Sequence, residues 1–228
     1  GAGKTTLLRV LARQVEIERG QVWLDGIDLC DLGRAQLRRA IGMVTQESFL
    51  FSTTLAENVA LGAPRASRAE IDAAVAKAQL DTDLAQLPDG LDTVVGERGV
   101  KLSGGQRQRA ALARVLLLQP KLLLLDDIVS AIDTATAARI HAALQPLRAR
   151  CTTVVVAHRI ASVLDADEIL VLDRGRVVER GNHAALVARG GLYADLFHRQ
   201  SRREALEQEL HGLGGDGLDA ATGRGHDA

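Results

Sequence analysis

The sequence has few cysteines, few aromatic residues and no surplus of either charge, and each scarcity excludes a class of protein. Cys30 and Cys151 are too far apart to form a metal-binding motif and too few to form a disulfide framework in 228 residues, which favours a reducing cytosol. Lys and Arg total 28, whereas Asp and Glu total 29. The chain lacks the excess of positive charge that would favour binding to nucleic acid or to an acidic membrane. We therefore expect no nucleic-acid partner.

Long hydrophobic runs and a secretory signal are also absent. The most apolar stretch, residues 115–125, is interrupted by a Gln-Pro-Lys triplet and falls short of the roughly 18–20 residues that span a bilayer. The chain begins with Gly1, and its one methionine is Met43, so we interpret it as a fragment of a longer protein. Hydrophobic residues make up 46% of the chain, which is enough for a globular core.

The first six residues contain a phosphate-binding pattern. They are Gly1, Ala2, Gly3, Lys4, Thr5 and Thr6, which form the second half of the motif G-x-x-x-x-G-K-[ST] and lead into apolar residues at helical spacing. Glycines allow backbone N–H groups to approach phosphate oxygens, Lys4 reaches the terminal phosphates, and the Thr5 hydroxyl can bind Mg²⁺. The alternative is an ordinary glycine-rich turn. The motif's opening glycine would precede Gly1.

Two carboxylates follow a predicted buried strand. Residues 122–125 are four leucines, directly followed by Asp126 and Asp127. A second continuous apolar run at 153–156 indicates parallel strands covered on both faces. Because ligands gather at the carboxyl ends of such strands, we expect Asp126 to hold Mg²⁺ and Asp127 to lie toward an attacking water. The alternative is that this acidic pair begins a surface loop.

A second predicted anion site lies at the start of another helix. Leu102 is followed by Ser103, Gly104, Gly105 and Gln106, and residues 107–118 are predicted to be helical. Ser103 occupies the N-cap position, and the two glycines expose the backbone. A chain with two such helix N-termini either binds two nucleotides by itself, or each N-terminus contributes to a different nucleotide site that is shared with a second chain. These residues alone leave both possibilities open.

These motifs together resemble the ABC ATPase family. Residues 102–106 match its signature motif, and the phosphate loop, Gln46, Asp126 and His158 follow the family's order within residues 1–200. The resemblance implies an α/β fold: a P-loop NTPase core with a mostly parallel sheet flanked by helices, and an inserted helical subdomain at about residues 47–114. It also implies head-to-tail pairing of two nucleotide-binding domains, in which residues 103–106 contact ATP held by the other domain.

The resemblance further implies individual roles and a membrane partner. Gln46 would contact Mg²⁺ and the attacking water, and His158 would contact the γ-phosphate; residues 130–133 resemble the family's D-loop. Residues 47–58 and 95–99 resemble segments of exporter-type members that contact a transmembrane domain, here expected in the same parent chain. Phe49 and Phe51 would lie near its coupling helix, or else pack in the helical subdomain.

The function implied is an ATP-hydrolysing domain of an ABC exporter at the cytoplasmic face of the cell membrane, with ATP and Mg²⁺ as cofactors. Most active members carry glutamate where this chain has Asp127. The shorter side chain predicts slow hydrolysis, since a misplacement of about 1 Å can cost roughly 10²-fold. We therefore hypothesise a heterodimer, with a homodimer as the alternative. A non-transport soluble ABC ATPase and a nucleotide-gated switch are the rival functions.

The remaining pattern predicts secondary structure and the end of the domain. Residues 22–24 and 41–44 are expected to be strands, residues 67–84 a helix, and residues 169–178 a hairpin with its turn at 173–175. A charged helix is expected after residue 200, where the ATPase domain ends. The glycine-rich residues 212–228 are expected to be disordered.

Overall fold

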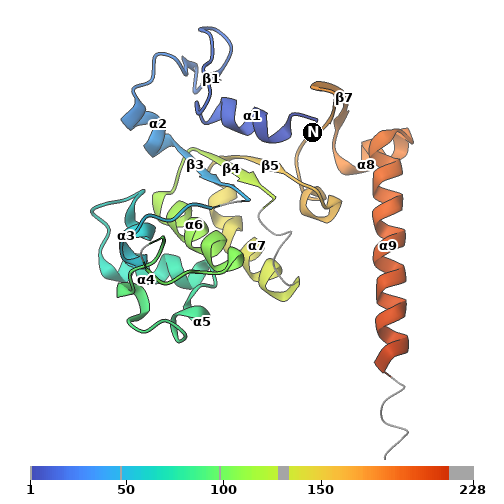
Figure 1. The fold of residues 1–228 in the computed structure, drawn as a ribbon. Helices are drawn as coiled ribbons and strands as arrows, with labels where there is room; N and C mark the ends of the chain where they lie inside the picture. The colour runs from blue at the N-terminus through green and yellow to red at the C-terminus, as the bar shows by residue number, and fades with distance from the viewer. Residues whose placement is uncertain (1, 47, 98, 128–133, 216–228) are drawn as a thin grey trace, which may run out of the picture. The chain divides into compact units, whose positions relative to one another are not determined.

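The computed structural model of the protein describes residues 2–46, 48–97, 99–127 and 134–215 (Figure 1). These residues pack into two units. One unit is formed by residues 3–158, and the other by Ala2 and the chain from Arg159 onward. Each unit is described by itself below.

The first unit is built on a parallel sheet. Its strands are β3 (Ile41–Val44), β4 (Leu122–Asp126) and β5 (Thr152–Val156), in the order β3-β4-β5. Every residue of β4, the middle strand, is buried, as its run of leucines predicts. Helices lie on both faces of the sheet (Figure 1). The α/β class with a parallel sheet flanked by helices is therefore confirmed.

The leucines of β4 explain why both faces are covered. Leu122 and Leu124 cluster with Leu8 of helix α1 (Lys4–Leu11) on one face. Leu123 and Leu125 point to the opposite face, because side chains alternate along a strand. There they belong to a cluster that includes Ile140 and Leu144 of helix α7 (Thr134–Arg148).

A group of helices is inserted between β3 and β4. In chain order these are α3 (Leu55–Ala60), α4 (Arg68–Lys77), α5 (Asp81–Leu84), the short 3-10 helix η1 (Gly90–Asp92) and α6 (Gly104–Leu118). Their apolar residues share one core with Val44, Leu123 and Leu125 of the sheet. The helical insertion is thus packed directly on the sheet.

The predicted helix at 67–84 is two helices in the structure. The chain leaves α4 at Gln79, whose φ of 57° is left-handed, and then forms α5. Leu80 is buried, and its N–H donates to the Val75 carbonyl at 3.1 Å. Apolar spacing continues across this break, and Gln79 is no glycine, so the sequence carries no stop signal here.

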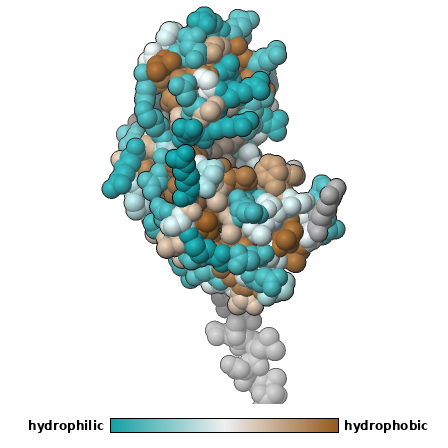
Figure 2. Space-filling model, turned by 90° about the vertical axis from the view of Figure 1, so that its left-hand side faces the viewer, coloured by the Kyte–Doolittle hydropathy of each residue, from teal (hydrophilic) through white to brown (hydrophobic). Residues whose placement is uncertain are grey.

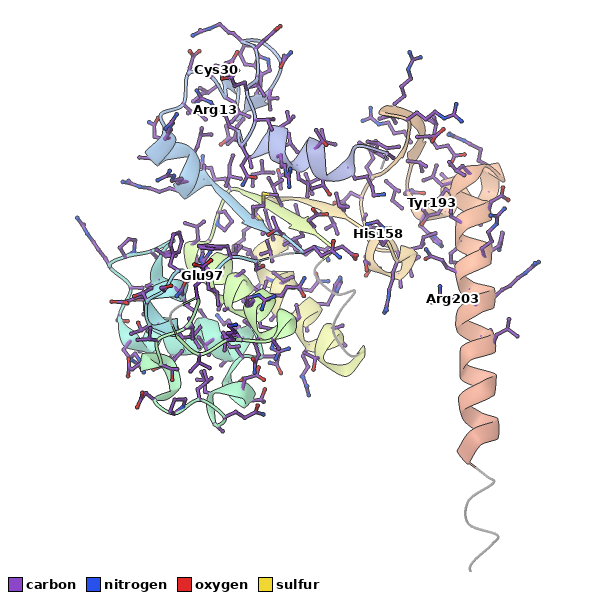
Figure 3. The ribbon with its side chains drawn as sticks, in the orientation of Figure 1. Arg13, Cys30, Glu97, His158, Tyr193 and Arg203 are labelled. Atoms are coloured by element: carbon purple, nitrogen blue, oxygen red, sulfur yellow. The ribbon has the colours of Figure 1, made fainter. Side chains whose placement is uncertain are left out.

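A small hairpin and a helix follow α1 in the chain. Strands β1 (Trp23–Leu24) and β2 (Ile27–Asp28) are antiparallel and joined by Asp25 and Gly26, both with positive φ, before helix α2 (Arg34–Ala40). The predicted strand and turn are therefore confirmed. Arg13 holds the chain after β2 by donating to the carbonyls of Leu29 and Leu32 at 2.9 and 2.8 Å (Figure 3).

The second unit has its own small core. It contains η2 (Ile160–Val163), β6 (Ile169–Asp173), β7 (Arg176–Gly181), α8 (His183–Arg189) and α9 (Leu192–Gly215). Strands β6 and β7 form the predicted hairpin. Leu186 and Tyr193 are buried in its core, and burial raises the pKa of Tyr193. Helix α9 extends through Gly215, so residues 212–215 are helical where glycine content predicts disorder; residues 216–228 lie outside the described residues.

The surface is mixed in character. On the face in Figure 2, hydrophobic and hydrophilic residues lie side by side. Among the described residues with large apolar side chains, Trp23, Phe49 and Phe51 are 61%, 62% and 51% exposed. Within the ranges that the structure describes, none of the helices is both long and apolar enough to cross a membrane.

Candidate functional site

The phosphate loop leads into α1 through a residue with a left-handed backbone. Gly3 caps the helix with φ 92°, and its carbonyl accepts the N–H of Leu7 at 3.0 Å. Lys4–Thr6 form the first turn, so their backbone N–H groups have no partner within the helix and face outward, as an anion requires. Gly1 lies outside the described residues, and Ala2 belongs to the second unit.

Three predicted site residues lie at or just beyond the carboxyl ends of the parallel strands. Asp126 ends β4 opposite Val156 of β5, and Gln46 follows β3 by two residues. His158 follows β5 by two residues (Figure 3). The start of α1 lies on the same side of the sheet as these strand ends (Figure 1). The structure therefore brings the phosphate loop and the strand-end side chains to one edge.

The two aspartates at this edge are both buried. Asp126 and Asp127 are each 6% exposed, and the Asp127 N–H donates to the carbonyl of Val156 at 3.0 Å. Asp127 has a φ of 48°, a left-handed conformation that aspartate adopts more readily than longer side chains do. A buried carboxylate requires donors or a cation nearby. A cation bound at this edge of the sheet would meet that requirement for Asp126.

The donor set here fits Mg²⁺. The Thr5 hydroxyl, the Gln46 amide and the Asp126 carboxylate offer oxygen atoms, which Mg²⁺ prefers, and the first two side chains are exposed. Among the described residues, no group of three or more His, Cys, Asp or Glu could enclose a metal. A Mg²⁺ ion held by Thr5, Gln46 and Asp126 would take its remaining ligands from phosphate and water.

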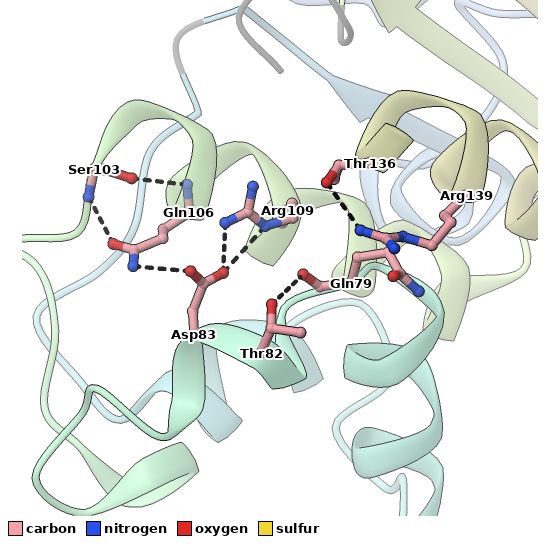
Figure 4. Close-up of polar contacts among 8 residues, drawn as sticks. All are labelled: Gln79, Thr82, Asp83, Ser103, Gln106, Arg109, Thr136 and Arg139. Carbon is pink, nitrogen blue, oxygen red and sulfur yellow. Dashed lines mark hydrogen bonds and ion pairs between the residues drawn. The ribbon is translucent and has the colours of Figure 1, made fainter. Parts of the chain in front are cut away.

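Residues Leu102–Gln106, called the signature turn below, form the N-terminus of α6. Ser103 is the N-cap, and its hydroxyl accepts the N–H of Gln106 at 3.2 Å. The Gln106 side chain accepts the Ser103 N–H at 2.9 Å, which completes a capping box (Figure 4). Ser103 and Gly104 are exposed. The turn thus presents an open helix N-terminus to solvent.

The two segments that flank the helical insertion lie side by side. The Leu55 N–H donates to Thr93, and the Val95 N–H donates to Thr53, both at 3.0 Å. Beside this contact, the exposed rings of Phe49 and Phe51 meet edge to face with centroids 5.1 Å apart. These phenylalanines therefore lie at the surface. Glu47, Arg98 and the predicted D-loop, residues 130–133, lie outside the described residues.

Comparison with known protein families identifies this arrangement. The family model described as "ABC transporter" matches residues 1–130, which hold the phosphate loop, Asp126 and the signature turn. The chain belongs to the ABC transporter family. Its ABC domain is 45% identical, over 209 residues, to an ATM1-type heavy metal exporter of Novosphingobium aromaticivorans. It is 44% identical over 209 residues to human ATP-binding cassette sub-family B member 6.

A solved structure supports the same relationship. The structure of a bacterial Atm1-family ABC exporter with ATP bound matches 87% of this chain with a TM-score of 0.80 and 45% identity. Both sequence alignments include 92% of this chain, but they include only 34% and 25% of the two relatives. The structural match covers 35% of the solved chain. The ABC domain therefore spans about a third or less of the proteins it matches.

Sequence reasoning missed Asp83, a residue that contacts the signature turn. Asp83 of α5 accepts hydrogen bonds from Gln106 and Arg109 of α6, more than 20 residues away in the chain. A single Asp on a short helical segment matches no motif. Only the packing of α5 beside α6 reveals the contact.

Proposed function

We propose that this chain is the ATP-binding and ATP-hydrolysing domain of an ABC exporter, and that it couples hydrolysis to transport across a membrane. The observation that carries the proposal is the gathering of the α1 N-terminus and the buried Asp126 at one edge of the sheet, in a chain 45% identical to an ATM1-type exporter. We place the domain at the cytoplasmic face of the cell membrane, attached to a transmembrane domain of the same parent chain.

Each side chain at the sheet edge has a proposed role in the chemistry. The backbone N–H groups of Gly3–Thr6 hold the phosphates, and the Lys4 ammonium offsets the charge of the terminal ones. Mg²⁺, when bound, would neutralise charge on the phosphate oxygens; Thr5, Gln46 and Asp126 would hold it. Asp127 accepts a proton from the attacking water, and His158 donates to the γ-phosphate.

The signature turn is proposed to serve a second nucleotide-binding domain. Ser103, Gly104, Gly105 and Gln106 form a helix N-terminus at which Ser103 and Gly104 are exposed. Head-to-tail pairing would bring the turn of one domain over the nucleotide held by the other. The exposed Phe49 and Phe51 would contact the coupling helix of the transmembrane domain.

Hydrolysis at this chain's own phosphate loop is proposed to be slow. Asp127 is one methylene shorter than the glutamate of most active relatives, and a displacement of about 1 Å can cost roughly 10²-fold in rate. A heterodimer would pair this weak site with a competent one, and a homodimer is the alternative. A chain that binds ATP, dimerises and barely hydrolyses would instead act as a nucleotide-gated switch.

ATP turnover by the natural full-length protein tests the proposal. We expect Lys4→Ala and Asp126→Asn to abolish turnover at this chain's loop, and Asp127→Glu to raise it. With the companion's phosphate loop inactivated by the equivalent lysine substitution, turnover that survives Lys4→Ala would contradict the assigned site. Brisk turnover by the unmodified subunit alone, unchanged by Asp127→Glu, would contradict the weak site. Co-purification with a membrane domain separates transport from a soluble ABC function.

A further inference from the structure

A carboxylate of the helical insertion reaches the first turn of α6. Asp83 Oδ1 accepts from Gln106 Nε2 at 3.2 Å, and Asp83 Oδ2 accepts from Arg109 Nε at 3.2 Å and from its Nη2 (Figure 4). The side chains of Asp83 and Arg109 are each only 15% exposed. A two-point ion pair shielded in this way resists rearrangement more than a solvent-exposed pair does.

These contacts fix the amide that caps the signature turn. A carboxylate only accepts hydrogen bonds, so the Gln106 amide must direct its NH₂ group at Asp83. Its oxygen is then left to accept the Ser103 N–H at 2.9 Å. Both the oxygen and the NH₂ group of the Gln106 amide are therefore hydrogen-bonded, and Asp83 helps to set the orientation of the amide in the capping box.

The charges in this cluster also bear on anion binding. The Arg109 guanidinium lies close beneath Gly105, since a Cβ added to that glycine would be 3.4 Å from Nη1. Asp83 is therefore a negative charge near a helix N-terminus that must attract phosphate, and Arg109 offsets it. The ion pair of Asp83 and Arg109 therefore holds the signature turn without adding a net negative charge that would repel phosphate.

We propose that Asp83 is a positioning residue for the signature turn, which it holds in the geometry that contacts the nucleotide of the companion domain. The inference rests on the proposed function, in which the turn closes over that nucleotide. The Asp83 carboxylate accepts hydrogen bonds from Gln106 and Arg109, the side chains of α6 that orient the turn. Its loss should weaken ATP binding in the companion subunit rather than in its own.

The test measures the ATP affinity of each subunit separately. The natural full-length dimer is prepared with a different tag on each subunit and with Asp83→Asn in one of them. A photoreactive azido analogue of ATP is titrated, and labelling of each tagged subunit is quantified. We expect affinity at the companion's phosphate loop to fall about fivefold, the equivalent of one lost capping interaction, and affinity at the variant's own loop to change less than about twofold.

Two controls separate positioning from general destabilisation. Asp92→Asn breaks the exposed ion pair between Arg68 at the start of α4 and Asp92 of η1, and it should alter neither subunit's affinity. If Asp83→Asn accumulates poorly, Arg109→Lys keeps the charge but loses the two-point contact, and it should show the same asymmetry. Asp83→Glu, which retains the carboxylate, should restore part of the companion's affinity.

Each outcome supports or overturns the inference. Equal losses in both subunits would mean that Asp83 only stabilises the fold, and no loss in either would remove its role; both results overturn the proposal. Ser103→Arg is measured in the same arrangement. If Ser103→Arg also lacks asymmetry, the shared site of the proposed function is wrong; if it is asymmetric while Asp83→Asn is not, only the positioning role fails.

Discussion

Replacing Leu8 by alanine tests how α1 holds the phosphate loop on the sheet. Leu8 is fully buried against Leu122, Leu124 and Val156, and it lies about one helical turn after Lys4. Removing a leucine side chain from such a core costs about 2–5 kcal/mol, from lost burial and the cavity left behind. We expect about 3 kcal/mol here.

That loss can be measured by thermal unfolding of the purified chain, followed by far-ultraviolet circular dichroism. At about 2–4 °C per kcal/mol for a protein of this size, Leu8→Ala should lower Tm by roughly 6–12 °C. The neighbouring Leu7 is 38% exposed, so Leu7→Ala is a matched control that should change stability by less than about 0.5 kcal/mol. Equal effects of the two substitutions would refute the docking of α1 described here.

Two further predictions concern helix capping and pH. The Ser67 side chain accepts the Glu70 N–H at the start of α4, so Ser67→Ala should destabilise the fold by about 1 kcal/mol in urea unfolding. Asp28 accepts the N–H groups of Gly20 and Cys30 at 2.5 and 2.8 Å, and these bonds lower its pKa below the ordinary 3.8. Asp28→Asn should therefore lower Tm at neutral pH, where the carboxylate is charged.

The pH dependence of the Asp28 effect has a definite sign. Because the pKa of Asp28 is lower in the folded state, the carboxylate contributes stability above its ordinary pKa and loses that contribution as the pH falls through the folded value. The Tm difference between Asp28→Asn and the parent should shrink in that acidic range. A difference that is constant with pH would contradict the assignment, and an unchanged stability of Ser67→Ala would contradict the cap.

The elements with strong local signals were predictable from the sequence. The four leucines of β4 predicted a strand buried on both faces, and the turn at residues 173–175 predicted the β6–β7 hairpin. The break between α4 and α5 was not predictable, because it occurs at a left-handed Gln79 inside continuous apolar spacing. Helix α9 likewise runs through Gly215 despite its glycines.

The residues of the candidate site also fall into predictable and unpredictable groups. Short motifs of a few consecutive residues were enough to predict chemical roles for Lys4, Asp126 and Ser103. The contact of Asp83 with Gln106 and Arg109 joins side chains from two helices, and no short pattern encodes it. Likewise, the sequence left the position of Phe49 and Phe51 open between core and surface, because that position depends on how the segments around Thr53 and Val95 pair.

The central claim is that the phosphate loop and the signature turn of one chain act in two different nucleotide sites. The most direct test is nucleotide labelling of each subunit in dimers that carry Ser103→Arg in one tagged subunit. Our account predicts that labelling of the companion's phosphate loop falls at least about tenfold while the variant's own loop retains its labelling. Loss of labelling in the variant subunit, with the companion unaffected, would contradict it.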